Sequence, residues 1–275
     1  MRDKTKKTIE KNYGDNLEQM KSKLGDYLEI AEVIPILFGG PSIYFHHKAL
    51  LEANKKFLGT HHLDMIYAVL PSWGMHRMGK TMAKVCSFSN FENSICKGGN
   101  RAMIDKLRKI SKDELLQESD ISDDISDIAE LIPEIEATIS DAHIVSASKT
   151  LHHILPHIVP PIDREYSLRF MKQGYKSFNK SQINVNKKED EKDFVKIFMT
   201  GMKKFFTSKE WKPFNNKIER IEPNPQVDWN GAFNTSLPKI FDNLIVAFVK
   251  CHRDGFTVKE AKKLKAKVLK KENEA

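Results

Sequence analysis

The 275-residue chain lacks any apolar run that approaches the roughly 20 residues needed by a membrane-spanning helix. It begins Met-Arg-Asp-Lys-Thr-Lys-Lys, without the apolar segment of a secretory signal. Both absences argue against a membrane protein and against an exported one. We therefore predict a cytoplasmic protein with no membrane partner.

Cysteine is scarce, since Cys86, Cys96 and Cys251 are the only three in the chain. They are widely spaced, odd in number, and form no Cys-x-x-Cys pair. This pattern argues against a disulfide framework and against a structural zinc or iron–sulfur site. Reduced thiols are expected instead.

Histidine is more frequent but has no metal-binding pattern. His153 and His157 have the four-residue spacing of a metal pair on a helix, yet Pro156 lies between them. No His-Glu-x-x-His motif accompanies them. We predict no metal and no cofactor.

The formal net charge is +8 and the isoelectric point is near 9.1. Residues 112–141 are strongly acidic, so the rest of the chain is more basic than this average. Lysines concentrate in residues 172–217 and 259–271. Such a balance favours an anionic partner, nucleic acid first, although a lysine run can also be only a solvated surface.

Apolar residues recur at helical spacing along most of the chain, which predicts an all-α fold. A lysine-rich helical extension, residues 175–275, follows a core of residues 1–174. The clearest helix opens with Ser236 as its cap and Pro238 close behind. The predicted helices are 15–34, 42–57, 63–70, 78–88, 91–96, 101–110, 121–132, 134–140, 146–155, 164–172, 194–206, 237–250 and 257–271.

Lys149 and Asp163 stand at two neighbouring predicted helix starts. With Ser146 as the cap, Lys149 lies in the first turn, where the helix dipole disfavours a cation and favours a neutral, nucleophilic amine. Asp163 follows the stiff Pro160-Pro161-Ile162 segment and is predicted to cap helix 164–172. The plainer alternatives are a phosphate or solvent contact for Lys149 and capping alone for Asp163.

This segment resembles the helix-hairpin-helix DNA glycosylase superfamily. Ser148-Lys149-Thr150 is similar to the family's lysine step, and Pro161-Ile162-Asp163-Arg164-Glu165-Tyr166 to its aspartate motif, with Gly174 downstream. Upstream, residues 65–76 resemble the helix whose end enters the minor groove. The sequence departs from the family in its glycine-free turn at 143–147 and in a lysine-to-aspartate spacing shorter by about one helical turn.

The resemblance implies a two-lobed, multi-helix glycosylase fold that acts as a monomer on double-stranded DNA. Asp163 would be the catalytic carboxylate and Lys149 the Schiff-base nucleophile, giving base excision with lyase activity. Repair or antiviral defence, including action on modified phage bases, would be the setting. The implied DNA contacts are Trp73, Met75, Arg77, Lys80, Ser146, Ser148 and Arg164, and the implied base pocket is Tyr44, Tyr67, His152, His153 and Tyr166.

Several alternatives stay open at this point. Trp73 suits a wedge into the base stack or a core position equally well, and aromatic residues at helical spacing are usually core. The polar residues 234–236 and 242–243 could cap and pack, or reach the pocket. The chain could also be a non-catalytic nucleic-acid-binding protein with this fold, or an enzyme acting on free nucleotides.

Overall fold

The computed structural model describes residues 1, 3–74, 85–109, 120–139, 143–179, 188–224, 226 and 233–273. Within these residues the regular secondary structure is helical and forms no strand, only an isolated antiparallel bridge between Val85 and Thr138. The all-α prediction is confirmed. None of the described helices is long and apolar enough to cross a membrane.

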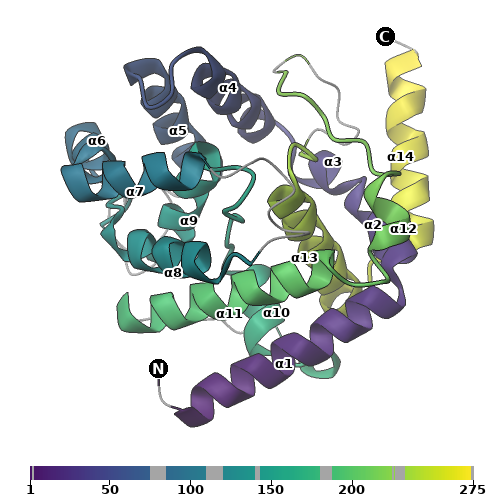
Figure 1. Ribbon diagram of the computed structural model, residues 1–275. Helices are drawn as coiled ribbons and strands as arrows, with labels where there is room; N and C mark the ends of the chain where they lie inside the picture. The colour runs from purple at the N-terminus through teal and green to yellow at the C-terminus, as the bar shows by residue number, and fades with distance from the viewer. Residues whose placement is uncertain are drawn as a thin grey trace.

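The α-helices follow one another along the whole chain (Figure 1). Their bounds are α1 Asp3–Ser22, α2 Leu24–Ala31, α3 Ile34–Phe38, α4 Pro41–Lys55, α5 Thr60–Ser72, α6 Phe88–Cys96, α7 Gly98–Arg108, α8 Ser122–Leu131, α9 His143–Ile154, α10 Ser167–Lys172, α11 Lys188–Phe206, α12 Lys212–Asn215, α13 Leu237–Asp254 and α14 Val258–Asn273. Short 3₁₀ turns lie at Ile132–Glu134 and Tyr175–Ser177.

The helices pack in a non-sequential order around one hydrophobic core. α4 and α5 pack together and both contact α9, whereas α1 runs along α10 and α11 (Figure 1). α13 packs on α2 and α10, and α14 covers α2. Core residues come from both sides of residue 174, so the C-terminal helices share the core of the first 174 residues.

Helix α1 is locked to α11 through a close approach at Gly201. A Cβ atom on Gly201 would lie only 2.1 Å from Cε1 of Tyr13. The Tyr13 hydroxyl donates to the carbonyl of Phe198 at 2.8 Å. Glycine is required here because the tyrosine ring fills the place of a side chain.

The predicted start of helix α13 is confirmed: Ser236 is its N-cap, and Ser236 Oγ accepts a hydrogen bond from the amide of Lys239. Two other predictions are wrong. The helix predicted over 15–34 is two helices that meet at Lys23. The helix predicted over 134–140 is absent from residues 135–139, because the carbonyls of Glu136 and Ala137 bind the thiol and amide of Cys86 instead. Most of predicted helix 78–88 lies outside the described residues.

Candidate functional site

Helix α9, which carries Lys149, begins at His143 and not at Ser146. Ser146 is therefore inside the helix, where its hydroxyl lies 3.0 Å from the carbonyl of His143 and 2.8 Å from the hydroxyl of Thr138. This corrects its predicted role as cap. Lys149 consequently lies in the second turn of α9, so the helix-dipole explanation for a perturbed lysine does not hold.

Ser148 ties the proline-rich segment to α9. Its Oγ donates to the carbonyl of Val145 at 3.2 Å and accepts the amide of Ile162 at 3.0 Å. Ser146 and Ser148 are both fully buried. Because they are buried, both serines are removed from the predicted set of DNA contacts. Ser148 instead holds the backbone of Ile162, the residue before Asp163, against α9.

The prediction that Asp163 caps helix 164–172 is wrong in its position, because α10 starts at Ser167 with Tyr166 as its N-cap; Asp163 instead caps the turn that precedes the helix. Its Oδ1 accepts the amides of Glu165 at 2.7 Å and Tyr166 at 3.2 Å. Its own amide donates to Ser167 Oγ at 3.0 Å. With one carboxylate oxygen held by two amides, Oδ2 points to Lys149, whose Nζ is 3.4 Å away.

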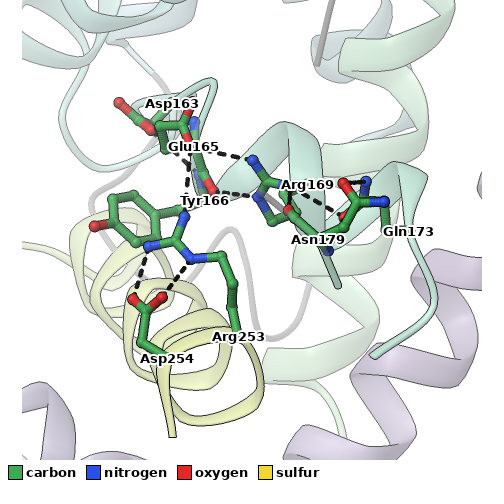
Figure 2. Close-up of polar contacts among 8 residues, drawn as sticks. All are labelled: Asp163, Glu165, Tyr166, Arg169, Gln173, Asn179, Arg253 and Asp254. Carbon is green, nitrogen blue, oxygen red and sulfur yellow. Dashed lines mark hydrogen bonds and ion pairs between the residues drawn. The ribbon is translucent and has the colours of Figure 1, made fainter. Parts of the chain in front are cut away.

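The Asp163 turn is braced by the buried Arg169 of α10 (Figure 2). Arg169 Nε donates to the carbonyl of Glu165 at 3.1 Å, and Nη2 donates to the Glu165 carboxylate at 3.1 Å. Nη1 reaches Gln173 Oε1 at 3.1 Å and also the carbonyl of Asn179. Arg253 of α13 contacts Glu165 from the other side, so the turn is held between α10 and α13.

Lys149 is almost completely buried, with its Nζ 4.1 Å above the centre of the Trp73 ring. Burial lowers the pKa of its ammonium group, which the charges of Asp163 and Asp242 oppose and that of Lys239 reinforces. The result is an amine that gives up its proton more easily than a surface lysine does. The sequence predicted such an amine, but burial causes it.

Lys149 and Asp163 open onto one cavity of about 250 Å³, hereafter the Lys149 cavity. Among the predicted site residues, Trp73 and Tyr166 also line it. Its walls are Ile34, Phe38, Ser42, Ser72, Trp73, Lys149, Asp163, Tyr166, Phe233, Lys239, Asp242, Asn243 and Val246. A mainly apolar wall with a few convergent charged groups is typical of a small-ligand site.

A second lysine–aspartate pair, Lys239 and Asp242 of α13, lines the same cavity. The sequence flagged Asp242 and Asn243 as able to reach the pocket, but it missed Lys239. The sequence does contain a pattern that could have identified Lys239: it and Asp242 are two opposite charges one turn apart in a helix that is otherwise buried and mainly apolar. Burial raises the pKa of the Asp242 carboxyl, and the adjacent Lys239 opposes this.

Two buried polar atoms of the cavity walls have no hydrogen-bond partner within the described part of the chain. They are Nε1 of Trp73, a donor, and Oδ1 of Asn243, an acceptor. Buried polar atoms normally have partners.

The remaining predicted site residues lie elsewhere. Tyr67 donates to the carbonyl of Cys86 and packs on Phe88, whereas Tyr44 is exposed on α4. The lining of the Lys149 cavity includes none of four predicted base-pocket residues, Tyr44, Tyr67, His152 and His153. Arg164 is half-buried beside Asp163. Met75, Arg77 and Lys80 fall outside the described residues, so their predicted DNA contacts stay predictions.

His153 belongs to a buried hydrogen-bonded chain that ends at the backbone of Lys149. His153 Nδ1 donates to the Lys149 carbonyl at 2.7 Å, so its Nε2 accepts from His46 Nδ1 at 3.0 Å. His46 Nε2 in turn accepts from Thr235 at 2.9 Å. Within the residues described, no group of three His, Cys, Asp or Glu is arranged to hold a metal ion.

Two buried histidines, His62 of α5 and His153 of α9, make the fold sensitive to acid. Burial lowers the pKa of both His62 and His153 to about 4, against an ordinary value near 6.5. Each therefore stabilises the fold above pH 6.5, and this contribution is lost as the pH falls from 6.5 toward 4. We expect about 3 kcal/mol to be lost per ring by pH 4.

The measurement is urea unfolding of the wild type and His62→Gln between pH 7 and 4. His62→Gln should lower the free energy of unfolding at pH 7. Between pH 7 and 4, however, the free energy of unfolding of this variant should decrease less steeply than that of the wild type. His61→Gln is the control because its ring lies in solvent, and it should follow the wild type. Identical pH slopes for all three proteins would contradict the assignment.

A larger cavity of about 420 Å³ lies beside α4 and α7 and is lined by Arg108, Arg220 and Glu222 among others. Its lining residues include no lysine. Of these two cavities, only the Lys149 cavity therefore brings an amine and a carboxylate together. No protein-family model, curated protein or solved structure matches the chain significantly.

Proposed function

We propose that the protein is a DNA glycosylase that excises a damaged or modified base, with Lys149 also acting as a Schiff-base nucleophile. One observation carries the proposal: Lys149 Nζ lies 3.4 Å from Asp163 Oδ2 on the wall of a cavity. The resemblance of both motifs to the helix-hairpin-helix glycosylases supports the same assignment. The net charge of +8 suits a DNA partner.

Asp163 would stabilise the transition state. Breaking the N-glycosidic bond leaves its electron pair on the base and builds positive charge at C1′ and O4′ of the sugar. A carboxylate held rigidly by two backbone amides needs no reorganisation to stabilise that charge. Its partial exposure, 29% of the side chain, lets a sugar approach from solvent while Lys149 holds the other side.

Lys149 would attack C1′ as a neutral amine. Its nitrogen lone pair forms the C1′–N bond as the base leaves with the electron pair of the glycosidic bond. The nitrogen then gives a proton to the departing base, and its lone pair expels O4′, which takes a proton from water. The product is an iminium ion that borohydride can reduce. A nucleophilic lysine needs a desolvated setting, which the Lys149 cavity provides. The volume of about 250 Å³ lies just below the usual 300–1,000 Å³ of ligand pockets, which suits one flipped base.

A panel of duplexes tests this function. Each duplex carries one candidate base: uracil, 8-oxoguanine, an alkylated purine or a hypermodified phage base. Free base is measured by mass spectrometry after incubation with excess protein. Release from at least one duplex is expected. Binding to every duplex without any release would favour the alternative, a non-catalytic nucleic-acid-binding protein.

A further inference from the structure

Lys239 and Asp242 are an ion pair that stability alone does not explain. Both side chains are nearly fully buried, at 4% and 6% exposure, and they contact one another across one turn of α13. Taking two charges out of water costs more than their attraction usually returns. Stabilisation of α13 does not by itself account for two buried charges at this place.

The pair and the catalytic lysine share one aromatic ring. The Nζ atoms of Lys149 and Lys239 lie 4.1 and 5.2 Å from the centre of the Trp73 ring. Lys239 Nζ also lies 4.7 Å from the centre of the Phe233 ring. Two ammonium groups are thus held against one indole in a water-poor cavity, where charges act on one another strongly.

The ionisable groups around Lys149 come from three elements. His153 lies on its own helix, and Asp163 and Tyr166 lie on the turn before α10. Lys239 and Asp242 face it from α13. Asp163 also holds its own turn, so within the described part of the chain the α13 pair is the source of charge near Lys149 that has no such backbone role.

We propose that Lys239 and Asp242 are a positioning pair that sets how readily Lys149 gives up its proton. Lys239 is a fixed positive charge, anchored by Asp242 and by two aromatic rings, and it disfavours a second ammonium beside it. Asp242 offsets this charge and keeps the repulsion moderate. The pair thereby sets the fraction of neutral amine at neutral pH, and this role rests on the proposed function of Lys149 as nucleophile.

Opposite signs follow for the two partners. Lys239→Gln removes the repelling charge and leaves Asp242, so Lys149 should titrate at least about one pH unit higher. Asp242→Asn leaves Lys239 uncompensated, so Lys149 should titrate about one unit lower. The double variant should lie between them, near the wild type. Lys239→Arg keeps the charge and should also titrate like the wild type.

The titration is read without DNA, from the ¹³Cε shift of Lys149 in full-length lysine-labelled protein. Lys149→Met identifies the signal by its absence. The exposed pair Lys11 and Asp15 is the matched control, because it also joins a lysine to an aspartate within one helix. Lys11→Gln and Asp15→Asn should leave the Lys149 signal unchanged.

Opposite shifts for Lys239→Gln and Asp242→Asn support the positioning role. Shifts of the same sign, or no shift in either variant, overturn it. If one single variant fails to fold, the other decides: a shift of about one unit in its expected direction supports the role, and no shift or a shift of the opposite sign overturns it. A shifted Lys239→Arg, which keeps the charge, also contradicts the role. Opposite shifts without any base release would leave the charge coupling standing and overturn the proposed glycosylase function instead.

Discussion

Asp163→Asn is expected to reduce base release by about 10²–10³-fold while leaving DNA binding nearly unchanged. The substitution removes the charge that faces Lys149 and that, in the proposed mechanism, would face the sugar. It keeps an Oδ1 acceptor for the amides of Glu165 and Tyr166, so the turn survives. The measurement is single-turnover release from whichever duplex of the panel the wild type cleaves, with binding followed by fluorescence anisotropy.

Glu165→Gln is the matched control for this prediction. Glu165 is the next carboxylate along the turn, but it faces Arg169 and Arg253 and not the Lys149 cavity. Its loss should change release by only a few-fold. If Asp163→Asn releases base at the wild-type rate, or if both variants lose activity equally, Asp163 is not the catalytic carboxylate.

Arg169→Leu is expected to destabilise the fold by about 1–3 kcal/mol, the range for leaving hydrogen-bonding groups without their partner. Arg169 has a fully buried side chain and joins the Asp163 turn to residues 173 and 179 (Figure 2). Leucine would leave the carbonyls of Glu165 and Asn179 without this donor. The free energy of unfolding, measured by urea denaturation, tests the value.

Arg164→Leu is the control for stability. Arg164 lies in the same turn but makes no hydrogen bond or ion pair with a described residue in the structure. We expect a change within about 0.5 kcal/mol, as for most surface substitutions. A loss below 1 kcal/mol for Arg169→Leu, on the order of an ordinary mutation, would mean that the turn does not depend on Arg169.

The pairing of Lys149 with Asp163 was predictable because both residues lie in one short segment. Pro160 and Pro161 restrict the backbone between them, and Asp163 has the local signal of a cap. The start of α9 was not predictable in this way. Ser146 is a good cap by type, but Glu191 of α11 accepts the amide of Ile144 at 3.2 Å, so a carboxylate from far along the chain caps the helix before position 146.

Lys239 could be found only from the fold. It lies far along the chain from Lys149, and packing of α13 on α10 brings it to the Lys149 cavity. The opposite error, a residue predicted in the site that lies elsewhere, occurs at Tyr67, His152 and His153. Their residue types suit a base pocket, but their neighbours in the folded chain are Cys86, Val159 and the Lys149 carbonyl.

Peptide mapping of a borohydride-reduced complex is the most direct test that the Lys149 cavity receives the sugar of a DNA nucleotide. The protein is mixed with duplex DNA that carries one abasic site, reduced, digested and analysed by mass spectrometry. We predict a reduced deoxyribose adduct on the peptide that contains Lys149, absent from Lys149→Gln. An adduct on Lys239 or on exposed lysines of α14 instead, or no adduct at all, would contradict the assignment.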